Sequence, residues 1–136
     1  MERKRARLEM YVHLVWATYR RLPLIVPDRE RQVHHLVEFE AKERGCDVLA
    51  IGGLDDHIHI LLKLPSVVSV AQLVKQMKGV SSRRLTSEWE GEVFKWQDGY
   101  SATTLHKSLL PCVKNYVSLQ RERHKRNEIW PELESF

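Results

Sequence analysis

The sequence predicts an α+β domain built on one antiparallel sheet, and three observations support this fold class. Segments with strand-like and helix-like patterns follow one another in the order β-α-β-β-α-β-α. The 136 residues are enough for one compact domain with a hydrophobic core. No internal repeat, low-complexity tract or Gly/Ser linker divides the chain, so we expect a single domain over residues 1–136.

The chain is expected to begin with a strand and a helix. Residues 10–18 are rich in β-branched and aromatic side chains, which favour a strand. Asp28 is a suitable N-cap for a helix over residues 29–44, and Gly45 is a suitable C-terminal stop. Apolar residues recur through this segment at rough helical spacing, so one face of the helix should pack on the sheet.

Two further strands should form a hairpin after this helix. Residues 46–51 predict the second strand, and residues 57–63 predict the third, which Pro65 ends. The residues between them are Gly52, Gly53, Leu54, Asp55 and Asp56. Glycine and aspartate favour turns, so we expect the two strands to pair antiparallel around this segment.

The second half of the chain should supply a helix, a strand and a last helix. Ser69 could cap a helix over residues 70–89, whose apolar residues repeat every three to five positions. Residues 93–105, interrupted by Gly99, suggest one or two short strands, and Ser108 could cap a final helix. The whole order is that of a ferredoxin-like, split βαβ fold, with helices mainly on one face and an extra C-terminal helix.

Charge permits a nucleic-acid partner without requiring one. The net charge is +4 and the sequence pI is about 9.2, with 22 Lys and Arg against 18 acidic residues. The basic residues gather in residues 3–7, 20–21, 75–84 and 121–126. No apolar run reaches the ~18 residues of a membrane helix, and no signal-type stretch follows the N-terminus. We therefore expect a cytoplasmic protein without a membrane partner.

The sharpest local signal is the histidine pair in the third predicted strand. Side chains alternate across a strand, so His57 and His59 point to the same face, with Cβ atoms ~7 Å apart. Two imidazole nitrogens could then converge on one cation, while Ile58 and Ile60 face the core. The competing interpretation is a histidine pair on a solvated sheet face, because this alternation is ordinary for a half-buried strand.

A second signal lies in the last predicted helix. Tyr116 and Gln120 are four residues apart and would share one helix face. Tyrosine can attack phosphorus when a metal polarises the electrophile, and the Gln120 carbonyl oxygen suits a hard divalent ion. Taken alone the pair is weak evidence, because a tyrosine on an amphipathic helix usually belongs to the core or its rim.

Together these segments resemble the single-tyrosine HUH transposases, which include insertion-sequence enzymes and their REP-associated relatives. HUH stands for two histidines around a hydrophobic residue. The resemblance covers nearly all of the chain, and the ordered set of segments is more specific than any one of them. The matching segments are Tyr19–Arg21, Asp56–Leu62, Lys78–Leu85, Trp96–Ala102 and Asn115–His124.

The resemblance implies a role for each matching residue. His57 and His59 would bind Mg²⁺ or Mn²⁺, and Gln120 would be the third ligand, on the same helix as Tyr116. Tyr116 would be the nucleophile that forms a 5′-phosphotyrosine on single-stranded DNA carrying a hairpin. The family also implies a homodimer, in which an exchanged helix could bring Tyr116 to the histidines of the second subunit. Asp55 stands where the family often has proline, and Leu119 replaces a polar residue, but no catalytic group is lost.

Basic residues on two predicted elements are candidates for the DNA surface. We hypothesise that this surface combines the end of the first strand with the second predicted helix, where lysine and arginine recur at helical spacing. The residues are Arg20, Arg21, Lys75, Lys78, Arg83 and Arg84. A solvated helix face is the alternative for the helical group.

Three other functions compete with cleavage and transfer of a DNA strand. A ferredoxin-like sheet can bind RNA through exposed aromatic residues on its central strands, but here those positions carry histidines. A domesticated, non-catalytic relative would bind its DNA or RNA hairpin and cut poorly. Zinc-dependent hydrolysis is the weakest alternative, because no third ligand stands at a compelling zinc spacing, although Asp56 is close by.

Overall fold

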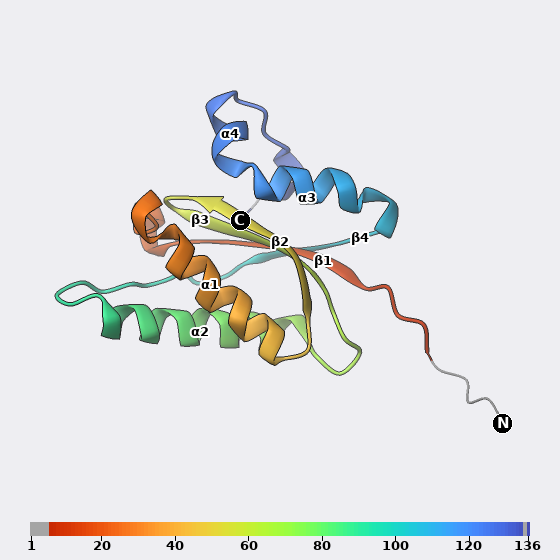
Figure 1. Cartoon of the computed structure of the whole chain (residues 1–136), viewed down its shortest axis with the longest axis horizontal. Coiled ribbons are helices and arrows are strands. Elements are labelled where there is room, and N and C mark those ends of the chain that lie inside the picture. The colour runs from red at the N-terminus through yellow and green to blue at the C-terminus, as the bar shows by residue number, and fades with distance from the viewer. Residues whose placement is uncertain (1–5, 135) are drawn as a thin grey trace.

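The described part of the chain, residues 6–134 and 136 of a computed structural model, forms one sheet with helices on both faces (Figure 1). The elements follow the predicted order, except that the last helix is two helices. They are β1 (Tyr11–Ala17), α1 (Pro27–Glu43), β2 (Asp47–Leu54), β3 (His57–Lys63), α2 (Val70–Glu88), β4 (Ser101–Leu105), α3 (Leu110–Ser118) and α4 (Gln120–Lys125). Short 3-10 turns cover Tyr19–Arg21, Lys107–Leu109 and Pro131–Leu133.

The sheet has the strand order β2-β3-β1-β4, and every neighbouring pair is antiparallel. The two central strands, β1 and β3, pair so that Val15 lies opposite His59 and Leu61 lies opposite His13. This register decides which residues meet across the middle of the sheet, because opposite residues point to the same face.

Each face of the sheet has its own hydrophobic core. On one face, α1 and α2 cover the alternate residues Leu14, Trp16, Ile58 and Ile60, all of which are buried. On the other face α3 covers a smaller cluster that includes Leu61 and Tyr116. The α+β, ferredoxin-like prediction is therefore confirmed, with the extra C-terminal helix on the face opposite α1 and α2 (Figure 1).

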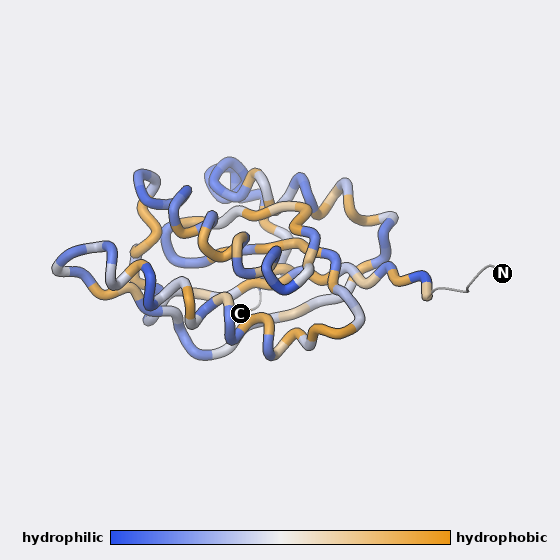
Figure 2. Tube along the Cα trace, turned by 60° about the horizontal axis from the view of Figure 1, so that its bottom comes forward, coloured by the Kyte–Doolittle hydropathy of each residue, from blue (hydrophilic) through white to orange (hydrophobic). Residues whose placement is uncertain are grey.

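Polarity follows the same layering. Hydrophobic stretches run along the strands between the helical layers, whereas α4 is hydrophilic throughout (Figure 2). Within the part of the chain that the structure describes, no helix is long and apolar enough to cross a membrane.

The predicted turn between β2 and β3 is shorter than expected, and close packing explains the difference. Gly52 and Gly53 lie inside β2, which runs to Leu54. A side chain on Gly52 would overlap the backbone of Val117 in α3, and one on Gly53 would overlap the backbone of His57. These glycines therefore allow close approach of two backbones rather than a bend.

The helix starts agree only partly with the sequence prediction. Ser69 caps α2 as expected, because its hydroxyl accepts a hydrogen bond from the Gln72 N–H at 3.1 Å. The Asp28 cap was wrong: α1 begins earlier, at Pro27, without a side-chain cap. The Ser108 cap was also wrong, because the Ser108 N–H donates to His106 in a 3-10 turn that precedes α3.

The final helix was predicted as continuous but breaks at Leu119, whose φ of −110° and ψ of 34° leave the helical region. The side-chain amide of Gln120 donates to the carbonyl of Tyr116 at 3.1 Å, beside this break. Tyr116 therefore lies in the last turn of α3, which ends at Ser118, while Gln120 starts the next helix, α4.

Candidate active site

The candidate site is centred on His57 and His59, which β3 presents toward α3. Both side chains are buried, with 1% and 0% of their surface exposed. The alternative interpretation, a histidine pair on a solvated sheet face, is wrong, because α3 and the C-terminal segment cover this face. The Tyr116 ring lies edge-on to His59, with centroids 5.9 Å apart, and the Phe136 ring lies 5.0 Å from His57.

The Nδ1 atom of each histidine has a fixed partner. His57 Nδ1 lies 2.9 Å from Oδ1 of Asp56, whose other oxygen accepts a hydrogen bond from Arg21 at 3.1 Å. His59 Nδ1 lies 2.8 Å from Nε2 of His13, on β1. These contacts orient both rings, so that both Nε2 atoms face the same space.

The carboxylate of Glu134 occupies that space. Its oxygens lie 3.5 Å from His57 Nε2 and 3.2 Å from His59 Nε2. Glu134 follows the 3-10 turn at Pro131–Leu133, whose Leu133 is buried against the α3 side of the sheet. Burial raises the pKa of this carboxyl, but the contacts with His59 and Tyr116 outweigh it and lower the pKa to about 2. Glu134 is therefore an anion at neutral pH.

Tyr116 points into the same space from α3 of the same chain. Its hydroxyl donates to Glu134 and accepts a hydrogen bond from the Trp130 N–H at 3.2 Å. Burial and the carboxylate of Glu134 raise the pKa of Tyr116 to about 12, so the phenol is protonated in this arrangement. The Arg123 guanidinium lies 5.4 Å from the ring centroid, which places a cation beside the phenol.

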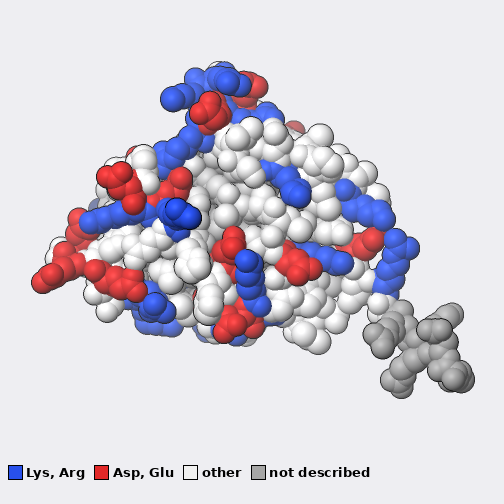
Figure 3. Space-filling view, viewed as in Figure 1, with Lys and Arg blue, Asp and Glu red and all other residues white. Residues whose placement is uncertain are grey.

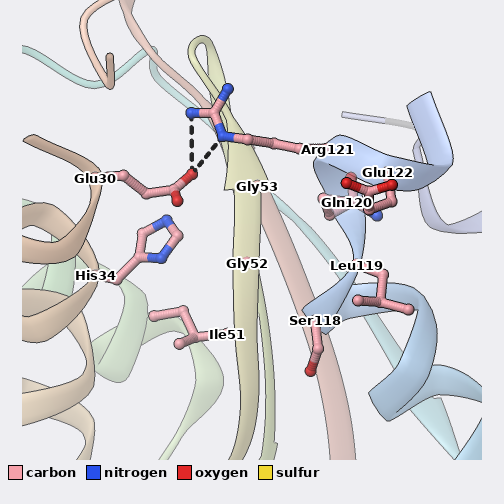
Figure 4. A pocket seen from close by; sticks show the side chains of 10 residues that line it. All are labelled: Glu30, His34, Ile51, Gly52, Gly53, Ser118, Leu119, Gln120, Arg121 and Glu122. Carbon is pink, nitrogen blue, oxygen red and sulfur yellow. Dashed lines mark hydrogen bonds and ion pairs between the residues drawn. The ribbon is translucent and has the colours of Figure 1, made fainter. Parts of the chain in front are cut away.

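Gln120 completes the cluster from the first position of α4. Its Oε1 lies 3.3 Å from His57 Nε2 and 3.1 Å from His124 Nε2. The next residue, Arg121, anchors α4 by ion pairs with Glu30 at 3.0 Å and Asp55 at 2.8 Å. Figure 4 shows Arg121 reaching across the edge of β2 toward Glu30, with Gln120 on the α4 side.

These side chains fit a divalent cation. The potential ligand atoms of His57, His59 and Glu134 all lie within 4.8 Å of one another. Among the residues that the structure describes, His59 Nε2 is buried without a hydrogen-bond partner, although it lies 3.2 Å from Glu134. Burial lowers the pKa of His59, which keeps its ring neutral and able to ligate at neutral pH. Two imidazoles with carboxylate and amide oxygens form a mixed set that suits Mn²⁺ or Mg²⁺.

The two predicted DNA-contacting groups meet at Gln97. Its side-chain oxygen accepts a hydrogen bond from the Arg20 N–H at 2.8 Å, and its carbonyl accepts one from Lys78 Nζ at 2.6 Å. Lys78 also donates to the Gly99 carbonyl at 2.9 Å, so its charge holds the 97–99 loop. Burial lowers the pKa of Lys78.

The remaining basic residues differ in whether their side chains form ion pairs within the protein. Lys75 and Arg83 are exposed on α2, whereas Arg84, also exposed, pairs with Glu88 at 3.3 Å. Arg21 pairs with Asp56 at 3.1 Å and lies over the Phe136 ring, so it belongs to the histidine cluster. A further basic group covers α4 (Figure 3). Part of the predicted N-terminal cluster, residues 3–5, lies outside the described residues.

Sequence reasoning missed three side chains of the cluster, namely His13, His124 and Glu134. The strand pattern predicted that residues 10–18 form a strand, but not which strand pairs beside it. Glu134 gave no signal, because it follows a turn whose path depends on packing. His124 lies four residues after Gln120, a spacing that places both on one helix face and could have drawn attention to it.

Comparison with known sequences places the chain among transposases. The family model described as "Transposase IS200 like" matches residues 6–120. The chain is 23% identical over 134 residues to the ISDra2 transposase TnpA of Deinococcus radiodurans, an alignment that covers 90% of this chain and 94% of that protein. It is 27% identical over 122 residues to the transposase for insertion sequence element IS200 of Salmonella typhimurium, with 85% and 80% covered.

Comparison with solved structures supports the fold. A putative transposase from Deinococcus radiodurans superposes with a TM-score of 0.66 and 24% identity, over 86% of this chain and 95% of that one. A REP-associated tyrosine transposase bound to a REP hairpin superposes with a TM-score of 0.62 and 16% identity, over 91% and 74%. Because both sequence identities are below 25%, these two structures show that the fold is shared.

Proposed function

Because the chain belongs to the IS200-like transposase family, we propose that it cuts and rejoins single-stranded DNA through a covalent bond to Tyr116. One observation carries the proposal: the Tyr116 hydroxyl and the Nε2 atoms of His57 and His59 converge on a single carboxylate, Glu134. A nucleophile and a pair of metal-ligating nitrogens thus face the same small space.

The ligands of a divalent cation would be His57 and His59 with the amide oxygen of Gln120. When bound, Mg²⁺ or Mn²⁺ would offset negative charge on the scissile phosphate. Asp56 and His13 would orient the two imidazoles from behind. Arg123, beside the phenol ring, would stabilise the anion that forms as Tyr116 loses its proton.

The chemical step would exchange one phosphoester for another. The phenol oxygen of Tyr116 attacks phosphorus, and a new P–O bond forms as the bond to the 3′ oxygen breaks. The phenol proton leaves Tyr116, and the departing 3′ oxygen takes up a proton to become a hydroxyl. Because the 5′-phosphotyrosine keeps the energy of a phosphodiester, a different 3′-OH can reverse the step without ATP, and the result is strand transfer.

Glu134 holds the position that the DNA phosphate would need. An attacked phosphate must lie between the metal ligands and the phenol oxygen, and the Glu134 carboxylate now bridges these same groups. The carboxylate also stabilises the protonated phenol, which is the opposite of activation. We infer that Glu134 leaves this position when DNA binds.

The substrate would be single-stranded DNA next to a folded hairpin. The solved structure of a related REP-associated transposase contains a REP hairpin, and the exposed basic residues of this chain offer phosphate contacts. Arg20 and Lys75 with Arg83 and Arg84 would bind the backbone, while Lys78 would hold the 97–99 loop between them.

A metal-dependence experiment tests the enzyme. Labelled single-stranded hairpin oligonucleotides are incubated with Mn²⁺ and the wild-type, His57→Ala or His59→Ala protein. We expect the wild type to cleave and both variants to lose cleavage while they keep hairpin binding, because the basic surface is untouched. Cleavage at the wild-type rate by a double His57→Ala, His59→Ala variant would exclude the proposed metal site.

Burial of the proposed nucleophile favours a second candidate function, in which this protein binds a hairpin but cuts DNA poorly. Tyr116 is 1% exposed, and its hydroxyl is held by Glu134. This candidate predicts hairpin binding with no covalent product under any metal. The homodimer implied by the family resemblance stays a prediction, and because Tyr116 faces the histidines of its own chain, one subunit already contains every proposed group.

A further inference from the structure

We propose that His13 is a positioning residue, which keeps the His59 ring in the form that can bind a divalent cation through Nε2. This inference rests on the metal site of the proposed function and deepens it. His13 lies on β1, 46 residues from His59 in sequence, and its Nε2 atom is 2.8 Å from His59 Nδ1. The two rings lie 5.0 Å apart between centroids.

The argument follows from the protons of a neutral imidazole. Such a ring carries one N–H, so one ring nitrogen donates and the other accepts. For His59 to ligate through Nε2, its proton must be on Nδ1, and because the side chain is fully buried this N–H needs an acceptor from the protein. His13 Nε2 is the nitrogen within hydrogen-bond distance of that position.

Packing alone does not account for a histidine at position 13. The side chain is 1% exposed, and its other nitrogen, Nδ1, is buried and has no hydrogen-bond partner in the described part of the chain. Buried polar groups usually have partners, and an apolar side chain would fill this place without the desolvation cost. The benefit that offsets this cost is the contact with His59.

Loss of His13 should weaken metal binding more than it weakens the fold. In the metal-free protein, His59 can move its proton to Nε2, where the Glu134 carboxylate lies 3.2 Å away. With a cation on Nε2 the proton cannot move there. In a variant without His13, the Nδ1–H of His59 would therefore stay buried and unpaired. The penalty therefore falls on the metal-bound state, and loss of such a partner typically weakens metal affinity by about 10–100-fold.

The test measures Mn²⁺ binding to the whole protein without DNA, by calorimetry or by the electron paramagnetic resonance of free Mn²⁺. His13→Leu removes the acceptor, while His13→Gln keeps one through its amide oxygen. His35→Leu is the control, since His35 is an exposed histidine on α1. We expect His13→Leu to weaken Mn²⁺ binding by about 10–100-fold, and His13→Gln to restore most of it. The control should bind as the wild type does.

Two outcomes would overturn the proposal, and they are distinct from failure of the metal site itself. A folded His13→Leu variant that binds Mn²⁺ like the wild type would show that His13 has no positioning role. Nitrogen NMR of the Mg²⁺-loaded wild type gives a check that does not depend on the variant folding. It should show the proton of His59 on Nδ1, and a proton on Nε2 would overturn the inference. If His57→Ala also leaves Mn²⁺ binding unchanged, the metal site of the proposed function fails, and this inference fails with it.

Discussion

Replacing Gly52 with alanine tests the contact that holds α3 against the sheet. An added Cβ would lie 3.0 Å from the carbonyl carbon of Val117 and closer still to its oxygen, whereas ordinary contacts begin at 3.4 Å. Both partners are backbone, so no side chain can rotate away. The helix must shift instead, and we expect overpacking to lower the free energy of unfolding by ~1–3 kcal/mol.

The same shift should reach the nucleophile, because Tyr116 directly precedes Val117 in α3. A displacement of about 1 Å can reduce a rate by about 100-fold, so DNA cleavage should fall by roughly that factor. The loss of activity should exceed the loss expected from unfolded protein alone.

Urea unfolding followed by tryptophan fluorescence measures the stability change, with Gly79→Ala as a matched control. Gly79 lies within α2, where an added Cβ would lie 3.3 Å from the flexible end of the Arg83 side chain. Alanine is favoured over glycine inside a helix by ~1 kcal/mol, so the control should gain stability. If Gly52→Ala were as stable and as active as the wild type, the close packing of α3 on β2 would be refuted.

Three further perturbations follow from the same structure. Glu134→Ala should raise the cleavage rate by about 10-fold or more, because it relieves a charge-assisted hydrogen bond worth ~1.5–3 kcal/mol. A slower reaction in single-turnover assays would instead make Glu134 a ligand or base. The pKa of His13, lowered by burial from 6.5 to about 3, means that the unfolded chain binds more protons between these values. The contribution of His13 to the free energy of unfolding is therefore fully present above pH 6.5 and is lost as the pH falls. At pH 5 the loss from this one histidine is ~2 kcal/mol. Urea titrations should show a smaller loss between pH 7 and pH 5 in His13→Leu, and equal losses would contradict the assignment. Arg83→Gln with Arg84→Gln should flatten the log–log salt dependence of hairpin binding by about one unit per lost phosphate contact, and an unchanged slope would remove these residues from the DNA surface.

Most of the fold could be predicted because local residue patterns determine most of its strands and helices. The alternation in residues 57–63 predicted β3 with the bounds that the structure shows, and Ser69 predicted the start of α2. The exceptions arise where packing overrides local preference. Gly52 and Gly53 read as a turn, but they lie in a strand because α3 and the partner strand approach too closely for side chains.

The site residues that could be predicted are those whose meeting depends on their spacing along the sequence. The two-residue period of a strand brings His57 and His59 together, and the spacing of Tyr116 and Gln120 survives the break at Leu119 because both helices pack beside β3 and β2. His13 and Glu134 could not be found in this way. Their places depend on the register of β1 against β3 and on the path of a C-terminal segment, and neither follows from local sequence.

Covalent capture tests the central claim most directly, because it identifies the attacking atom. The wild-type protein is incubated with Mn²⁺ and a labelled single-stranded hairpin oligonucleotide, denatured, and digested, and the peptide that carries the nucleotide is sequenced by mass spectrometry. Tyr116→Phe is the control, since it removes only the hydroxyl and preserves the packing volume. The proposed function predicts a 5′-phosphotyrosine on Tyr116 and no adduct in the control. An adduct on Tyr11, Tyr19 or Tyr100, or one that persists in Tyr116→Phe, would contradict it.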